Sequence, residues 1–306
     1  MKKALAIAVA SAFVAPVALA DVTLSGKVAY IYDIADGAQD TANLDVDQPS
    51  FTVAGSSETN QGYTVSGSIV WDGAFDSHNI TVGNTPVGTI AIGDVSGALD
   101  ATGDYTDIAP EQGGFGADGN DHFINVTFPS FNGVTLNVSM APEENNAGGA
   151  ENAVGASVTY TTGDTAIYYG MEESKAFGTA DDDTEVEMDA MGFKTSFGGV
   201  YLAYEIGNLK EGANKAKYTG LAIKYAMGDI TIGMEQQETD VEGAAFQREG
   251  DDAAAFLASS TVADADVTVA FVNYNFGGGL SSFVEVTSND DSATGDATAI
   301  GVAYSF

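Results

Sequence analysis

Carboxylates gathered in one long stretch are the residues of this chain whose types and spacing could do chemistry. Between Val95 and Asp121 there is no Lys or Arg, and the acids of that interval include Asp100, Asp104, Asp107, Glu111 and Asp118. Fixed carboxylates attract cations and repel anions, and the effect grows where a passage is narrow and partly desolvated. The stretch should therefore attract cations. An exposed acidic loop of no special consequence is the alternative.

Groups suited to making and breaking bonds are scarce. His78 and His122 are the only histidines, and the absence of Cys excludes thiolate metal sites, cysteine nucleophiles and disulfide scaffolds together. The sequence has no phosphate-binding, metalloprotease or nucleophile-elbow motif. Ser and Asp are so abundant that a combination with His means little without geometry. We therefore expect neither an enzyme nor a cofactor.

Two acidic runs could bind Ca²⁺ through carboxylate oxygens. They are Asp118 to Asp121 and Asp181 to Asp183, and neither has the ordered ligand spacing of a dedicated calcium loop. Solvated acids are the simpler interpretation, and a bound Ca²⁺ is the alternative.

The charge balance excludes one class of partner. The chain has 10 Lys and Arg against 44 Asp and Glu, a formal net charge of −34. Such an excess repels polyanions and attracts cations. Nucleic acid is therefore not an expected partner, whereas cations are.

Short segments of alternating apolar and polar residues must position the acidic stretch. We expect strands near 22–34, 47–57, 62–72, 77–84, 88–94, 121–128, 133–141, 153–161, 165–172, 187–197, 200–206, 218–227, 229–237, 266–276, 279–287 and 297–306. Tight connections alternate with long acidic ones, such as 35–47 and 207–217, as in an up-and-down barrel. Residues 253–262 are placed within a long seventh loop, because a barrel with both ends on one side needs an even number of strands.

Alternation within the strands indicates which face is wet. Leu136 and Val138 fall on one face, while Thr135 and Asn137 fall on the other. A membrane barrel turns the apolar set toward lipid, whereas a soluble β-sandwich would bury it. Sixteen strands leave an aqueous channel. The expected fold is all-β: a sixteen-stranded antiparallel transmembrane β-barrel, one domain over residues 21–306.

The N-terminus indicates export. Residues 1–3 are basic at two positions, residues 4–19 are apolar, and Ala18 to Ala20 is a small-x-small site. This is the pattern of a secretory signal peptide, here residues 1–20, which leaves Asp21 as the mature N-terminus. Loss of Lys2 and Lys3 would take the net charge from −34 to −36.

The C-terminal segment 297–306 has a stripe of apolar side chains that ends in aromatics. Ile300, Val302, Tyr304 and Phe306 share one face of this expected strand. A terminal aromatic at alternate spacing resembles the outer-membrane assembly signal of bacterial β-barrel proteins. Phe306 is therefore the expected assembly signal, and a closing strand of a soluble sandwich is the alternative.

The acidic stretch also carries a motif. Residues 105–114 read YTDIAPEQGG, which resembles the third-loop signature Y-T-D-x-x-P-E-F-G-G of the general trimeric porins of Gram-negative bacteria, with Gln112 in place of Phe. The motif lies where that loop belongs, between the fifth and sixth expected strands, and residues 90–94 are also similar to the family. Over the rest of the mature chain the resemblance is one of pattern.

The resemblance implies that the third loop folds into the barrel and narrows it at mid-height. Asp107 and Glu111 match the acids that project into the gap, and we expect Asp100 and Asp104 at the same pore constriction. Lys27 resembles one member of the basic cluster that the family places on the opposite wall. It is therefore the expected positive group of the constriction.

The basic cluster is where the chain departs from the family. Asn125 and Thr127 stand where an arginine would be expected, and the only Arg is Arg248, in the seventh loop. Lys194 and Lys224 have inward parity but lie farther round the barrel, where they could equally be rim charges. The field across the pore should therefore be weaker, and the net potential more negative, than in members with an arginine cluster.

These features together predict a porin of the cell outer membrane. The expected molecule is a homotrimer in outer-membrane lipid that forms a water-filled channel for passive diffusion of small hydrophilic solutes, with a preference for cations and neutral molecules. An outer-membrane β-barrel enzyme or adhesin that acts through its loops is the alternative function.

Overall fold

The chain folds as a succession of β-strands joined by turns and loops. The computed structural model describes residues 21–36, 41–71, 75–103, 105–110, 122–141, 151–175, 185–242, 246–247, 261–262, 264–290 and 296–306. The first strands are β1 Asp21–Asp36, β2 Thr41–Glu58, β3 Thr64–Trp71, β4 Phe75–Thr85, β5 Gly88–Asp94, β6 His122–Thr127, β7 Val134–Met140, β8 Glu151–Thr162 and β9 Thr165–Lys175. The others are β10 Glu185–Phe197, β11 Val200–Glu211, β12 Asn214–Met227, β13 Ile230–Glu242, β14 Phe246–Gln247, β15 Thr261–Val262, β16 Ala265–Gly277, β17 Leu280–Asn289 and β18 Asp296–Ser305. No helix in this described part of the chain is long and apolar enough to cross a membrane.

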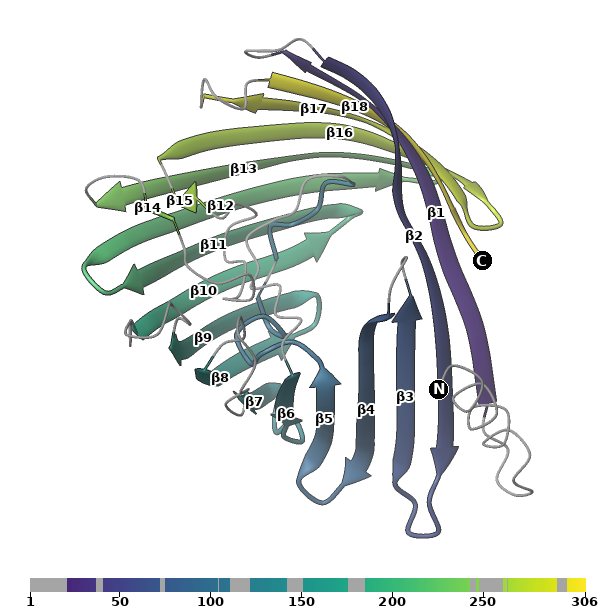
Figure 1. The fold of residues 1–306 in the computed structure, drawn as a ribbon, viewed down its shortest axis with the longest axis vertical. Helices are drawn as coiled ribbons and strands as arrows, with labels where there is room; N and C mark the ends of the chain where they lie inside the picture. The colour runs from purple at the N-terminus through teal and green to yellow at the C-terminus, as the bar shows by residue number, and fades with distance from the viewer. Residues whose placement is uncertain are drawn as a thin grey trace, which may run out of the picture.

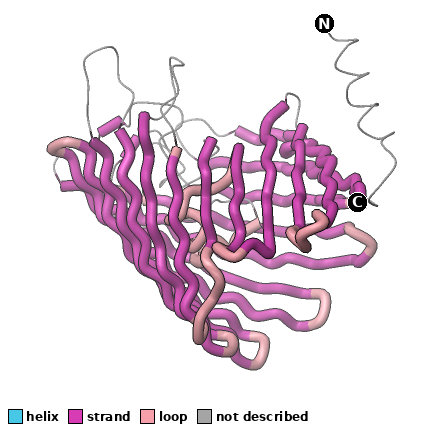
Figure 2. Tube along the Cα trace, turned by 90° about the horizontal axis from the view of Figure 1, so that it is seen from below, coloured by secondary structure: helices cyan, strands magenta, loops and turns pink. Residues whose placement is uncertain are grey.

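Sixteen of these strands close into one antiparallel barrel. Neighbours in the wall are neighbours in chain order, β13 pairs with β16, and β1 pairs with both β2 and β18. The two-residue strands β14 and β15 form a separate sheet. Figure 1 shows the wall from purple β1 to yellow β18, and Figure 2 shows it from below. The expected sixteen-stranded antiparallel barrel is confirmed, while cleavage after residue 20 falls outside the described residues and stays a prediction.

The prediction of a long loop at 207–217 is wrong. β11 runs to Glu211 and β12 begins at Asn214, so a tight turn joins them, with Gly212 at a φ of 58°. Glycine adopts this left-handed conformation without steric cost. The polar composition imitates a loop, but the alternation of a strand continues through it, since Leu209 and Ala216 are both buried.

The connection expected at 35–47 is also shorter than predicted. β1 extends to Asp36 and β2 begins at Thr41. Barrel strands that reach beyond the apolar band carry polar residues on both faces, so composition alone places their ends too early. Of residues 253–262, only Thr261–Val262 are described, and they form the strand β15 outside the barrel, while the rest of that prediction lies outside the described residues.

The wall has one apolar and one polar or small-residue face. On β12, Leu221 and Ile223 are 38% and 42% exposed, whereas Ala222 between them is fully buried. On β7, Leu136 is exposed while Asn137 is buried. In a closed barrel the exposed apolar set faces outward, and the buried set faces the lumen.

The C-terminal residue closes the seam between the first and last strands. The Gly26 N–H donates to the Phe306 carbonyl oxygen and the Phe306 N–H donates to the Gly26 oxygen, each at 3.0 Å. A Cβ at Gly26 would lie 2.7 Å from Phe306 Cζ, so the ring covers the glycine. Phe306 also stacks on Tyr304, with ring centroids 6.0 Å apart. These contacts give the expected assembly residue a structural part in barrel closure.

We predict that deleting Phe306 lowers the yield of folded barrel. The deletion removes two backbone hydrogen bonds, each contributing about 1 kcal/mol, and the ring over Gly26. Heat-modifiable migration on detergent gels measures the folded fraction. The matched variant Phe306→Tyr keeps the ring and both hydrogen bonds and should fold like the parent. Equal yields of folded barrel from the deletion variant and the parent would show that Phe306 is not needed for barrel closure.

Candidate functional site: a loop on the inner wall

The connection after β5 turns back onto the lumen side of the barrel wall. Ser96 accepts a hydrogen bond at its carbonyl oxygen from Asn125 Nδ2 on β6 at 2.9 Å, and the Ala98 N–H donates to Ser139 Oγ on β7 at 2.8 Å. Val95 packs against the buried Phe123. The loop therefore leaves β5 sideways and crosses the neighbouring strands.

Small residues on the lumen face make room for this crossing. A Cβ at Gly170 on β9 would lie 2.8 Å from Leu99 Cδ1, and one at Gly220 on β12 would lie 2.6 Å from Thr106 Oγ1. Leu99 and Thr106 thus occupy space that larger wall residues would fill. Because the two glycines lie on strands far apart in the wall, they mark the path of the loop from β9 to β12.

A buried glutamate on β11 anchors the loop. Glu205 is fully buried, and its Oε2 accepts hydrogen bonds from the Thr106 N–H at 2.8 Å and from Thr106 Oγ1 at 2.7 Å. Its Oε1 accepts from the Tyr168 hydroxyl at 2.6 Å. A buried carboxylate is stable when several donors replace its water, and Glu205 has three. Both carboxylate oxygens of Glu205 therefore accept hydrogen bonds within the protein.

A second buried glutamate, on β13, holds the next residues of the loop. Glu235 Oε2 accepts hydrogen bonds from the N–H groups of Ile108 and Ala109, each at 3.0 Å. Gln237 Nε2 approaches the other oxygen at 3.3 Å. Irregular backbone inside a barrel needs partners for its N–H groups, and these two carboxylates supply them.

Aromatic rings complete the attachment. The Tyr105 ring packs edge to face against the Tyr168 ring, with centroids 4.9 Å apart. The backbone carbonyl oxygen of Tyr105 accepts a hydrogen bond from the Tyr201 hydroxyl at 2.6 Å. Lys194 Nζ lies 3.8 Å from the Tyr105 ring centroid, and Lys224 Nζ lies 4.9 Å from that of Tyr201. Burial, and then the charge of Glu205, raise the pKa of Tyr105 to about 12, so its phenol stays neutral.

Two of the four predicted loop acids lie on this attached segment. Asp107 is half-buried between Thr106, held by Glu205, and Ile108, held by Glu235. Asp100 is half-buried in the turn where the Ala101 N–H donates to the Gly97 oxygen. Asp104 and Glu111 lie outside the described residues.

Lys27 lies on the other side of the barrel. It pairs with Ser50 on β2 and Ser305 on β18, whereas the loop contacts the strands from β6 to β13. The structure therefore does not bring Lys27 onto the same wall as Asp107.

No group of three or more His, Cys, Asp or Glu side chains among the described residues could hold a metal ion. The runs 118–121 and 181–183 fall outside them, so their interpretation as solvated acids or as Ca²⁺ ligands stays as predicted.

Sequence reasoning missed the residues that hold the loop. Glu205 and Glu235 have inward parity in the middle of strands, each beside an exposed apolar residue, Tyr204 and Met234. An acid on the lumen face at mid-strand is the signal that could have identified them. Lys194, for which a rim position stayed open, instead lies over a tyrosine of the loop.

We predict that Glu205→Gln loosens the loop without unfolding the barrel. The amide supplies only one acceptor where three donors converge, and a hydrogen bond to a charged group contributes about 1.5–3 kcal/mol. Hydrogen exchange of peptides covering 105–110 should therefore accelerate about tenfold or more. Glu173→Gln, at an exposed position on β9, is the matched control and should leave exchange unchanged. Unchanged protection in Glu205→Gln would show that the loop is held by other contacts.

Comparison with known proteins agrees with this architecture. No curated protein sequence matches the chain, but the model of the Gram-negative porin family matches residues 4–306. A porin structure refined at 1.8 Å resolution is 17% identical, with a TM-score of 0.72 over 94% of this chain and 100% of that one. An anion-selective porin from Comamonas acidovorans is 15% identical, with a TM-score of 0.73 over 94% of this chain and 100% of that one. The trimer form of OmpT from Vibrio cholerae is 14% identical, with a TM-score of 0.69 over 94% and 99%.

Identities this low show a shared fold, and the family match adds the relationship. The match spans nearly the whole chain, from residue 4 to residue 306, and the wall has the same closed sixteen-stranded form. The chain therefore belongs to the Gram-negative porin family.

Proposed function

We propose that this protein is a passive diffusion channel of the outer membrane for small hydrophilic solutes, with a preference for cations and neutral molecules. Its family and fold are those of a porin channel rather than of an enzyme. The observation that carries the proposal is the attachment of residues 105–110 to the inner wall by Glu205 and Glu235, with Asp107 between the two anchors.

The width of the bore decides which solutes can pass. A ring of sixteen strands is too wide to sieve small solutes, and a loop on its inner wall reduces the bore while leaving the hydrogen bonds of the wall intact. Asp107 adds a fixed negative charge to this narrowed part. Glu111, Asp104 and Asp100 belong to the same loop, and we assign them to the same constriction.

Lys27 is the positive group that we place across the gap. It stands on β1, on the far wall, and no arginine cluster accompanies it, because Arg248 is the only arginine of the sequence. Asn125, at a position where the family would have arginine, is buried and donates to the Ser96 oxygen.

Lys194 and Lys224 also have inward parity. The five acids of the loop still outnumber these three lysines, so we expect the field in the passage to favour cations. The signal-peptide pattern of residues 1–20 supports export, and the family supports the outer membrane as the destination.

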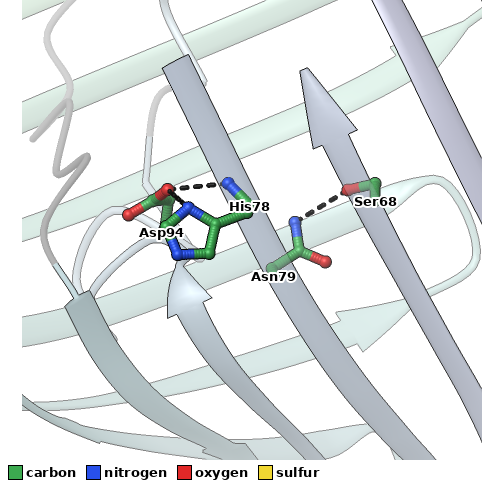
Figure 3. Close-up of polar contacts among 4 residues, drawn as sticks. All are labelled: Ser68, His78, Asn79 and Asp94. Atoms are coloured by element: carbon green, nitrogen blue, oxygen red, sulfur yellow. Dashed lines mark hydrogen bonds and ion pairs between the residues drawn. The ribbon is translucent and has the colours of Figure 1, made fainter. Parts of the chain in front are cut away.

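We also propose that the protein is a homotrimer. The outer face of β1 to β6 has a groove of about 740 Å³, lined by Ile69, Ile80 and Ile92 among others. Beside it, His78 Nδ1 lies 2.9 Å from Asp94 Oδ2, and the Asp94 side chain is only 5% exposed (Figure 3). A carboxylate and an imidazole on the outward face are costly against lipid, so a neighbouring subunit is the better cover.

We predict that the outward faces of β4 and β12 respond differently to polar substitution. Ile80→Asn should weaken trimers, whereas the matched Ile223→Asn, on a face assigned to lipid, should leave the trimer intact. The two isoleucines are 58% and 42% exposed in the single chain. Unheated detergent gels and light scattering measure assembly. Monomers in the parent protein, or equal trimer stability in the two variants, would contradict the assignment.

The selectivity prediction concerns Asp107 and Glu111. A fixed negative pair in a narrow passage lowers the energy of a passing cation, and salt weakens this effect as the Debye length falls from about 30 Å at 0.01 M to about 3 Å at 1 M. Asp107→Asn with Glu111→Gln should therefore lower the cation-to-anion permeability ratio, most strongly at low salt. Reversal potentials under a KCl gradient measure the ratio.

The matched control neutralises two acids of another connection, Asp182→Asn with Asp183→Asn. These residues belong to the acidic run between β9 and β10, away from the third loop in sequence. They should shift the reversal potential less than the loop pair. Equal shifts from the two double variants would mean that the diffuse net charge of the mature chain, −36 without Lys2 and Lys3, sets selectivity.

A further inference from the structure

A cavity of about 690 Å³ lies between the loop and the tight-turn ends of β6 to β11. The wall contributes side-chain hydroxyls with inward parity, namely Thr127, Thr135, Thr159, Thr161 and Ser196. The loop closes one side through residues 101–103 and Tyr105. Cavities of this size suit small solutes, and a lining of hydroxyls suits solutes that are themselves hydroxylated.

One fixed cation faces this cavity. Lys194 lines it, half-buried, with its Nζ 3.8 Å from the Tyr105 ring centroid, and it has no ion pair among the described residues. The charged groups that act on it are Glu205 and Lys224. Glu205 is already held by three donors, so the ammonium group keeps N–H donors for an anion. Asp164 stands exposed at the rim of the cavity.

A buried acceptor lines the cavity from another strand. Asn137 on β7 is 5% exposed; its Nδ2 donates to Ser157 Oγ at 3.4 Å, and its Oδ1 has no hydrogen-bond partner among the described residues. Buried side-chain oxygens rarely stay unpaired, because each loses its hydrogen bonds to water. This oxygen has less than 1 Å² of exposed surface, so a solute hydroxyl donates to it when the Asn137 side chain turns toward the cavity.

We propose that the cavity is a binding subsite for small hydroxy acids, solutes with one carboxylate and several hydroxyls. Lys194 pairs with the carboxylate, while the threonine row and Asn137 bind the hydroxyls. The subsite rests on the proposed open channel, through which the solute reaches it. The other fixed charges of the pore are mostly negative and repel an anion. The Lys194 ammonium offsets this repulsion locally, so the anion can bind there.

The test uses single-channel recording in planar bilayers at constant KCl with three probes: gluconate, glucose and butyrate. Gluconate carries both recognised groups, glucose has hydroxyls without the charge, and butyrate has the charge without hydroxyls. Gluconate should reduce the current at a half-blocking concentration about tenfold below those of the other two, the equivalent of one hydrogen bond to a charged group. Equal effects of gluconate and butyrate, or of gluconate and glucose, would overturn the proposal.

Substitutions assign the effect to the cavity. Lys194→Met should raise the half-blocking concentration of gluconate about tenfold, and Asn137→Leu should raise that of gluconate without changing that of butyrate. Lys217→Met, at an exposed position on β12, is the control and should change neither. Heat-modifiable gels confirm that each variant is folded.

Two outcomes separate this inference from the proposed function. A parent protein without open-channel current in KCl alone would overturn the channel. Normal current with a gluconate effect that survives both Lys194→Met and Asn137→Leu would overturn only the subsite.

Discussion

The structure depends on hydrogen bonds between buried wall carboxylates and the backbone of an irregular loop. Buried N–H groups of an irregular segment that no turn or strand pairs need acceptors from the wall, because burial removes them from the water of the lumen. Glu205 and Glu235 supply acceptors for Thr106, Ile108 and Ala109. Because charged acceptors form the stronger hydrogen bonds, two side chains suffice to fix the position of the loop across several strands.

The wall is shaped to receive the loop by alternating large and small residues along one row. Tyr168, Gly192, Glu205, Gly220 and Gln237 are successive cross-strand partners from β9 to β13. The glycines leave space for Thr106 and for the Tyr168 ring, while the residues between them donate or accept hydrogen bonds. Filling a glycine position would displace the loop, and removing an anchor would release it. The width of the bore thus depends on residues of the wall as much as on the loop.

Sequence patterns could predict the barrel but not this attachment. The strand positions follow from alternation, which is local, and all sixteen expected strands are present. The partners of Thr106 lie 99 residues away at Glu205 and 112 away at Tyr218, and their meeting depends on the register of every intervening strand. The errors at 207–217 and 35–47 have a different cause, since strand ends beyond the apolar band are polar on both faces and resemble loops.

Carboxylates that are buried in the wall and carboxylates that border the passage do not act equally on a passing ion, so net charge alone is a poor guide to the field in the bore. The carboxyl oxygens of Glu205 and Glu235 accept hydrogen bonds from N–H and O–H donors, so a passing ion feels these groups less than it feels an acid that borders the passage. Counting all 44 acids therefore overstates the field in the bore. The sign of that field depends on position as well as number, because an acid paired with hydrogen-bond donors acts less on a passing ion than one that borders the passage. The sign belongs to the few charged groups that the hydrogen bonds of the wall leave facing the passage.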